Sequence, residues 1–332
     1  MDNQDIAQRL LELEQQMKEK STSENVTSAP KTDKTNHSFG LCLGGGGGKG
    51  AYQIGVYKAL AEYGFLDKIT AISGASIGAL NALLFAMKDY ELAEKCWDEI
   101  DMHTVFSSDI DLLFNDKPGI MSRKEMLELV DKYIDFNKFY TCGIDVYANV
   151  TYSDGNINKA RYIHLNEYER SQIKTIITAS SAIPLVYESV TFEGMELSDG
   201  GLSDNIPVAP LYDSKGLKNI IVCGLSKGSK KDLSRYRDAE FIEIYPSIGL
   251  GNTINGTLNF SKDAVKFRKL LGYKDTIRAI KIYEKDRNYI NNLAMYEQND
   301  LAEITATLRI EETNTRVHDT RSRLDAIINR YE

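Results

Sequence analysis

Short apolar runs alternate with stretches of helical periodicity through the middle of the chain. The apolar run Phe39–Leu43 precedes a helix-like segment at 51–63, and the apolar run Ile69–Ser73 precedes a second one at 79–87. Short apolar runs bounded in this way are typical of buried strands, because a strand covered on both faces needs no polar positions. The pattern therefore predicts an α/β fold in which short connections join strands and helices.

The same alternation continues beyond residue 90. Helices are expected at 91–100, 122–133 and 167–180, and strands at 145–152, 159–165, 185–192, 219–224 and 241–245. The two strands on either side of Asp154-Gly155-Asn156 are expected to pair as a hairpin, since this tripeptide is typical of a tight turn. Residues 101–121 mix apolar and acidic side chains, and we expect them to pack on the body rather than to form a lid.

An amphipathic helix is predicted at the N-terminal end of the chain. Its apolar positions are Ile6, Leu10, Leu13 and Met17. They recur at helical spacing and form one narrow stripe. Two heptads are too few for a stable coiled coil alone, so docking on the body and self-association through this helix are equally favoured.

Changes in composition predict the domain boundaries. We expect an N-terminal helix at 1–20, a flexible linker at 21–38, a folded body at 39–275 and a helical extension at 276–332. The linker is rich in Ser, Thr, Lys and Asn and has almost no large apolar residues. In the extension, Leu301, Ile304 and Leu308 share one helical face, which favours covering the body over binding a partner or a membrane.

A run of glycines separates the first predicted strand from the first predicted helix. From residue 44 to residue 50 its sequence is Gly-Gly-Gly-Gly-Gly-Lys-Gly. Backbone without Cβ atoms can approach a ligand closely, and a helix that starts just after it adds unpaired N–H groups and the positive end of its dipole. The run therefore predicts a cradle for an anion or an oxyanion rather than a linker.

Two phosphate-binding motifs compete for this glycine run. The P-loop pattern fails, because it needs a glycine where the chain has Leu43 and a Ser or Thr where it has Gly50. The dinucleotide fingerprint fits Gly45, Gly47 and Gly50, with Asp67 as the candidate for the acid that binds the ribose. Asp67 precedes the second predicted strand, however, whereas that acid belongs at its end. A nucleotide site stays open as the weaker alternative.

A candidate nucleophile follows the second predicted strand. Gly74, Ser76 and Gly78 form the pattern G-x-S-x-G between this strand and the helix expected at 79–87. A serine at a sharp strand-to-helix turn is held in a strained, exposed conformation, and the flanking glycines leave room for an acyl group. The context makes Ser76 the predicted nucleophile.

A serine hydroxyl needs a base, and the histidines of the chain are poor candidates. The four histidines are His37, His103, His164 and His318. None lies in a recognisable catalytic loop, so a surface or structural role is favoured for each. His318 is the least secure exclusion, because it follows a serine and an aspartate in the order that some hydrolases use.

The predicted base is Asp199, which directly precedes Gly200 and Gly201. An aspartate before two glycines lies on a tight turn that another loop can approach closely. A carboxylate with a pKa of about 3.9 is a weak base toward a serine, so this site needs desolvation or transition-state stabilisation. The predicted chemistry is acyl transfer, in which Asp199 accepts the proton of Ser76 as the serine attacks an ester.

In combination, these motifs resemble those of the patatin-like phospholipases, over about residues 38–275. Two further stretches, Ala179–Pro184 and Asp204–Val208, are similar to segments of bacterial members. Two positions depart from the family pattern: Gly44 stands where plant patatins commonly carry aspartate, and Lys49 replaces a frequent arginine.

The resemblance implies a three-layer α/β/α patatin-like sheet with a nucleophile elbow, and a lipid acyl hydrolase of the phospholipase A or lysophospholipase type. The implied oxyanion loop consists of Gly45, Gly46, Gly47, Gly48, Lys49 and Gly50, and the implied motif glycines are Gly74, Gly78, Gly200 and Gly201. The expected substrate is a phospholipid at a membrane surface, with no metal or cofactor. A catalytically silent scaffold is a further alternative.

Composition narrows the partners and the location. A chain of 332 residues with 42% hydrophobic content can bury a full core, and its formal net charge of −8 disfavours nucleic acid as a partner. The four cysteines are widely separated and lack metal-ligand spacing, which predicts reduced thiols without a zinc site. No signal peptide or spanning segment is visible, so we expect a cytoplasmic or peripheral membrane protein, with a secreted effector still open.

Overall fold

The structure is a computed structural model that describes residues 38–100, 123–155, 157–182, 188–252 and 256–309. The predicted helix at 1–20, most of the predicted linker, the segment 101–121 and the end of the C-terminal extension lie outside these ranges. All four cysteines are described, and each is a free thiol, as the sequence predicts.

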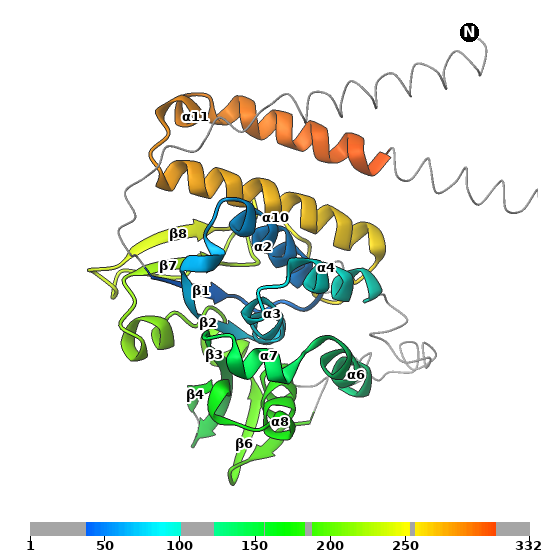
Figure 1. The fold of residues 1–332 in the computed structure, drawn as a ribbon, viewed down its shortest axis with the longest axis vertical. Helices are drawn as coiled ribbons and strands as arrows, with labels where there is room; N and C mark the ends of the chain where they lie inside the picture. The colour runs from blue at the N-terminus through cyan, green and yellow to red at the C-terminus, as the bar shows by residue number, and fades with distance from the viewer. Residues whose placement is uncertain (1–37, 101–122, 156, 183–187, 253–255, 310–332) are drawn as a thin grey trace, which may run out of the picture. The chain divides into compact units, whose positions relative to one another are not determined.

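Eight strands form one mixed sheet in the described part of the chain (Figure 1). They are β1 (Phe39–Leu43), β2 (Ile69–Ala75), β3 (Asp145–Asp154), β4 (Ile157–His164), β5 (Val190–Phe192), β6 (Met195–Asp199), β7 (Asn219–Cys223) and β8 (Glu240–Ile244). Their order is β5-β6-β3-β2-β1-β7-β8, and β4 pairs with β3. The strands from β3 to β8 along this order are parallel, whereas β4 and β6 run antiparallel to β3.

Helices join the strands and cover the sheet. The α-helices are α2 (Ala51–Glu62), α3 (Ile77–Ala86), α4 (Tyr90–Glu99), α6 (Arg123–Tyr133), α7 (Phe136–Thr141), α8 (Arg170–Ser180), α9 (Gly201–Asp204), α10 (Lys262–Tyr283) and α11 (Arg287–Asn291), and residues 293–309 are also helical. Shorter turns are η1 (Gly47–Gly50), η2 (Leu66–Lys68), η4 (Leu165–Glu167) and η5 (Pro210–Ser214). Among these described helices, none has the length and apolar character that crossing a membrane requires.

Side chains of the central strands alternate between two apolar clusters, one on each face of the sheet. In β1, Phe39, Leu41 and Leu43 belong to the larger cluster and Cys42 to the smaller one. Residues of α2, α3, α8 and α10 complete the larger cluster, and Leu211 of η5 belongs to the smaller. Because successive side chains of a strand point to opposite faces, an apolar run such as β1 serves both clusters. The predicted α/β sheet with helices on both sides is confirmed.

The long helix α10 lies along α2 (Figure 1). Two glycines permit the close approach: a Cβ atom added at Gly55 would lie 1.9 Å from the carbonyl oxygen of Lys269, and one added at Gly272 would lie 2.0 Å from that of Tyr52. The Tyr52 hydroxyl also donates to the buried carboxylate of Asp275 at 3.0 Å. Residue 275, the predicted end of the body, therefore lies inside α10 and not at a boundary.

Several elements differ from the sequence expectations. The pattern does not predict α7 or β6, and it starts the C-terminal helices at residue 276, whereas α10 starts at Lys262. A helix that packs against several elements has no single apolar stripe, which hides α10 from a periodicity argument. On the predicted C-terminal face, Ile304 is 2% exposed, but Leu301 is 47% exposed.

Candidate active site

Ser76 occupies the sharp turn between β2 and α3. Its backbone has φ 53° and ψ −124°, a conformation that costs a non-glycine residue free energy and that the surrounding structure must hold. The turn packs directly on β1, because a Cβ atom added at Gly78 would lie 2.2 Å from the carbonyl oxygen of Leu43. The elbow that the sequence predicts is therefore present, and the serine at its tip lines a cavity.

The pairing of β3 explains how Asp199 comes to lie beside Ser76. Strand β4 pairs with residues 147–154 of β3 and occupies one edge, so β2 and β6 share the other edge. Strand β2 runs parallel to β3 and ends where Ala75 pairs with Asn149. Strand β6 runs antiparallel and ends where Asp199 pairs with Val150, one residue further along. The two strands meet end to end, which joins the elbow to the base.

The Asp199 carboxylate is buried and lies close enough to the Ser76 side chain for that side chain to lower its pKa. Its Oδ1 atom also accepts the Gly201 N–H at 2.7 Å. Burial is the largest influence and raises the pKa of Asp199 to about 6, although the Gly201 N–H and the Ser76 side chain both lower this pKa. A carboxylate with this pKa is a stronger base than an ordinary aspartate and is still ionised at neutral pH.

The glycine loop reaches the nucleophile from the end of β1. The N–H groups of Gly44 and Gly45 already donate to backbone carbonyl groups, at 2.9 and 3.2 Å. Gly46 and Gly47 follow at the start of η1, and the first amides of a helix have no acceptor within it. The N–H groups of Gly46 and Gly47, which line the same cavity as Ser76, are therefore candidate donors for an oxyanion.

The six residues of the predicted oxyanion loop fall into two groups. Gly45, Gly46, Gly47 and Lys49 line the cavity, whereas Gly48 and Gly50 are buried and do not line it. A Cβ atom added at Gly48 would lie 2.3 Å from the carbonyl oxygen of Asn259, and one added at Gly50 would lie 2.6 Å from the Ile77 side chain. These two glycines permit close packing behind the loop.

The motif glycines outside the oxyanion loop differ in what they contact. Gly201 lines the cavity and donates to the base. Gly200 packs on β3, since a Cβ atom there would lie 2.1 Å from the Asn149 carbonyl oxygen. Gly74 packs against Gly78 within the elbow, with a corresponding distance of 2.2 Å. The Gly200 contact lets the loop after β6 approach β3, and the Gly74 contact lets the elbow turn tightly.

The C-terminal end of α8 contacts both halves of the candidate dyad. The Ser180 Oγ atom accepts the Ser76 N–H at 2.9 Å and donates to a backbone carbonyl of β3 at 2.7 Å. The Ser180 carbonyl oxygen accepts the Gly200 N–H at 3.1 Å, and that of Ala182 accepts the Asp199 N–H at 3.0 Å. The sequence alone assigns no role to Ser180, because these partners lie far away along the chain.

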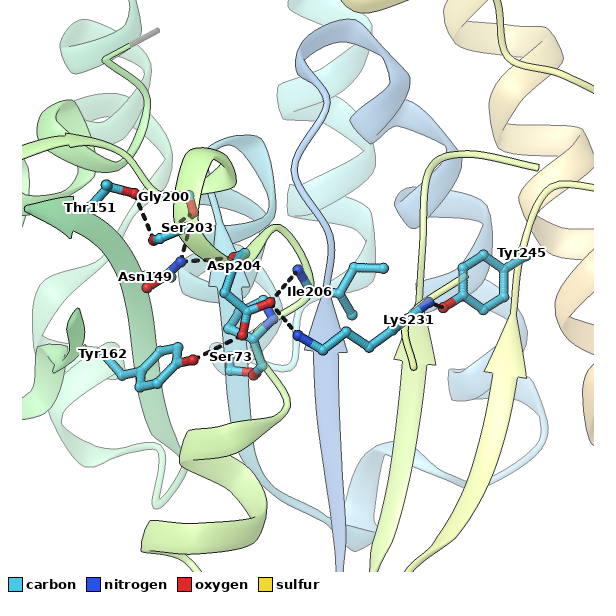
Figure 2. A network of polar contacts seen from close by, with 11 residues as sticks. Ser73, Asn149, Thr151, Tyr162, Gly200, Ser203, Asp204, Ile206, Lys231 and Tyr245 are labelled. Atoms are coloured by element: carbon cyan, nitrogen blue, oxygen red, sulfur yellow. Dashed lines mark hydrogen bonds and ion pairs between the residues drawn. The ribbon is translucent and has the colours of Figure 1, made fainter. Parts of the chain in front are cut away.

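A polar network holds the loop that follows the base (Figure 2). The Asp204 carboxylate accepts from the Tyr162 hydroxyl at 2.9 Å and from the Lys231 ammonium at 2.5 Å. The Asn149 side-chain amide donates to the carbonyl oxygens of Gly200 and Asp204, at 2.7 Å each. These contacts fix α9 against β3 and β4, next to Asp199 at the end of β6.

The candidate dyad opens on a cavity of about 450 Å³. Its apolar side chains are Leu202, Ile206 and Leu225, and its remaining polar side chains are Asp204, Asn205, Ser226, Ser229, Lys230, Lys231 and Thr257. A cavity that combines apolar and polar side chains suits an amphiphilic ligand. Within the described ranges, no cluster of His, Cys, Asp or Glu side chains has the arrangement of a metal site.

Two competing candidates that the structure describes, His164 as a base and Asp67 as a ribose-binding acid, lie away from this cavity. His164 is bound by Asp145 and Glu167, at 2.9 Å each, near the opposite end of β3. The other three histidines lie outside the described residues. Asp67 precedes β2 and has a 97% exposed side chain, so it lies at the end of that strand away from the glycine loop. This placement is unsuited to a ribose-binding acid.

Comparison with known families and curated proteins finds one matching family and several relatives. A family model for patatin-like phospholipases matches residues 41–212, just over half of the chain. Lysophospholipase NTE1 of Scheffersomyces stipitis is 28% identical over 211 residues, covering 61% of this chain and 13% of that protein. Patatin-like phospholipase domain-containing protein 7 of Rattus norvegicus is 28% identical over 220 residues, covering 62% and 15%. The matched stretch is therefore a small part of these longer relatives.

Solved structures with a related arrangement are more distant. VipD from Legionella pneumophila has a TM-score of 0.41 and 13% identity, covering 83% of this chain and 80% of that one. ExoU of Pseudomonas aeruginosa, in complex with SpcU, has a TM-score of 0.36 and 18% identity, covering 74% and 53%.

Proposed function

Because the chain belongs to the patatin-like phospholipase family, we propose that it hydrolyses fatty acyl esters of lipids, with Ser76 as nucleophile and Asp199 as general base. The buried Asp199 carboxylate close to Ser76, at a cavity lined in part by apolar side chains, is the main support. Burial gives the carboxylate the proton affinity that the role requires, and the elbow presents the serine to an incoming ester.

The first half of the reaction forms an acyl-enzyme. The Ser76 Oγ atom attacks the ester carbonyl carbon while its proton passes to Asp199. The carbonyl oxygen becomes an oxyanion, which the N–H groups of Gly46 and Gly47 stabilise. The carbon–oxygen bond to the alcohol then breaks, and the departing alkoxide takes the proton from Asp199. The products of this half are a free alcohol, such as a lysophospholipid, and an acyl-Ser76 ester.

The second half of the reaction regenerates the enzyme. A water molecule gives one proton to Asp199 as its oxygen attacks the acyl carbon, and the same amides stabilise the second oxyanion. When this intermediate collapses, the bond to the Ser76 Oγ atom breaks and the serine recovers its proton from Asp199. A fatty acid leaves, and every proton is accounted for without a further co-reactant.

Lipid-release profiling on defined phospholipids and neutral glycerides tests this function. We expect Ser76→Ala and Asp199→Asn each to lower the rate about a thousandfold or more, since each removes a group that reacts directly. Asp67→Asn is the matched control, because this aspartate is exposed and lies away from the cavity. A fluorophosphonate probe is expected to label Ser76.

Three results would contradict these assignments. Tight binding of a nicotinamide cofactor without probe labelling would favour the nucleotide alternative. Substantial activity of Asp199→Asn, together with loss in His318→Ala, would make the protein a histidine-dependent hydrolase. A folded protein that neither reacts with the probe nor releases fatty acid would be a silent scaffold.

A further inference from the structure

Three lysines line the catalytic cavity, and they differ in whether a carboxylate pairs with them. Lys231 is paired with Asp204 at 2.5 Å. Lys230 lies 3.9 Å from Glu243, at the limit of an ion pair, and its side chain is 63% exposed. Lys49 pairs with no carboxylate in the described part of the chain. The cavity therefore presents positive charge that its own residues do not neutralise.

A second cation, Arg268, lies near Lys49. The side chain of Arg268 is buried and donates to the carbonyl oxygen of Asn259 at 2.5 Å. Burial and repulsion by this guanidinium both lower the pKa of Lys49. An anion bound beside Lys49 would offset this repulsion and favour the charged ammonium.

The carboxylates of the same cavity are already engaged. Asp199 interacts with Ser76 and with the Gly201 N–H, and Asp204 accepts from Lys231 and a tyrosine hydroxyl. The ammonium of a choline or ethanolamine headgroup would therefore find no carboxylate free to pair with it on this wall. The charge pattern favours a headgroup that is negative overall.

The loop after β7 adds hydroxyl donors to this cationic wall. Ser226, Ser229 and Lys230 all line the cavity and lie within five residues of one another along the chain. An ammonium with nearby hydroxyl groups is a common way to bind the oxygens of a phosphate. Leu225, at the start of the loop, is one of the apolar side chains of the cavity, so the same loop offers contacts to the phosphate and to the apolar part of a lipid.

We propose that Lys49, Ser226, Ser229 and Lys230 form a headgroup subsite that selects phospholipids with a net anionic headgroup over zwitterionic ones. This selection rests on the proposed acyl hydrolase function and adds to it a substrate class and the residues that recognise it. Lys49 and Lys230 supply the charge, and the two serines supply neutral hydrogen bonds. Lys231 is paired with Asp204 and stabilises the loop, so it is not part of the subsite.

Short-chain lipids that remain monomeric in water separate this subsite from attraction to a membrane surface. We compare kcat/KM for dihexanoyl-phosphatidylglycerol and dihexanoyl-phosphatidylcholine, both below their micelle concentrations. The wild-type protein is expected to prefer the phosphatidylglycerol. Because no lipid surface is present, a preference measured in this way arises in the binding site.

The decisive variant is Lys230→Gln, with Lys227→Gln as its matched control. Lys227 lies in the same loop and carries the same charge, but it does not line the cavity. We expect Lys230→Gln to lower the ratio of the two kcat/KM values about threefold to tenfold, as the loss of one partly exposed charge contact would. Lys227→Gln is expected to keep the wild-type ratio.

Two outcomes would overturn the headgroup subsite. One is a wild-type protein that hydrolyses both lipids at equal rates, and the other is an equal change of the ratio in both lysine variants. A failure of the hydrolase function itself would look different. Neither lipid would then release fatty acid above the level of Ser76→Ala.

Discussion

At the scale of single residues, the candidate dyad combines two states that the surrounding structure must hold. Ser76 has a left-handed backbone conformation, and Asp199 is a carboxyl group buried beside it. Backbone strain of this kind costs about 1–3 kcal/mol per residue. A strained serine and a desolvated base together suit a nucleophile that must lose its proton.

The pKa of Asp199 leads to a prediction for the pH dependence of the rate. Because burial raises this pKa to about 6, the carboxyl is protonated below that pH and cannot accept the serine proton. We expect kcat/KM to rise with pH and to level off above a pKa of about 6. The measurement is a rate profile on a soluble ester whose own charge does not change between pH 4 and 8.

Labelling of Ser76 by a fluorophosphonate provides the control for this profile. The labelling rate depends on the same base, so it should follow the same pH curve. A plateau that begins near pH 4 in both experiments would mean that Asp199 has an ordinary pKa and that the inferred desolvation is wrong.

At the scale of elements, the site depends on strand ends that meet. Strand β2 leads into Ser76 and β6 ends at Asp199, and both strands end on one edge of β3 at Asn149 and Val150. The end of α8 then links the two loops through Ser180, whose Oγ atom contacts the elbow and whose carbonyl contacts the base loop. This serine is therefore expected to position the dyad.

Replacement of Ser180 tests this role. In Ser180→Ala, the Ser76 N–H and the β3 carbonyl lose their buried partner, which costs about 1–3 kcal/mol. We expect kcat to fall about tenfold or more with little change in KM, because the reacting groups lose alignment while the binding surface remains. The rate of probe labelling should fall in parallel.

Ser181→Ala is the matched control for this variant. Ser181 is the next residue along, is half-buried, and does not line the cavity. Its replacement should leave both rates near those of the wild type. If Ser180→Ala loses stability but keeps its kcat, the contact is structural and does not align the dyad.

At the scale of the whole molecule, α10 joins the C-terminal part of the chain to the core. The Asp275 carboxylate is 3% exposed and accepts from the Tyr52 hydroxyl, the Ser247 N–H and the Arg278 guanidinium. These partners come from α2, from the segment after β8 and from α10 itself. One buried carboxylate thus connects three parts of the fold.

Removal of this carboxylate should destabilise the protein as a whole. We expect Asp275→Ala to lower the free energy of unfolding by about 3 kcal/mol, because it leaves a half-buried guanidinium and two other donors without their common acceptor. Asp263→Ala, in the exposed first turn of the same helix, is expected to cost less than about 1 kcal/mol. Urea denaturation of both variants measures the difference, and equal losses would contradict it.

The local motifs of this protein could be predicted because each is complete within a few neighbouring residues. The glycine run, the elbow around Ser76 and the turn at Asp199 need only backbone freedom and a strand or helix on either side. The α/β class follows from apolar runs between helical segments for the same reason. These features limited the candidate chemistry to acyl transfer or anion binding.

Only the tertiary structure decided how those motifs combine. Sheet register joins β2 to β6, burial sets the pKa of Asp199, and packing divides the glycine loop into a cavity side and a buried side. Ser180 and Lys230 acquire their proposed roles from neighbours that lie far away in the chain. Desolvation and long-range contacts depend on the arrangement of the whole sheet, so no local pattern in the sequence can specify them.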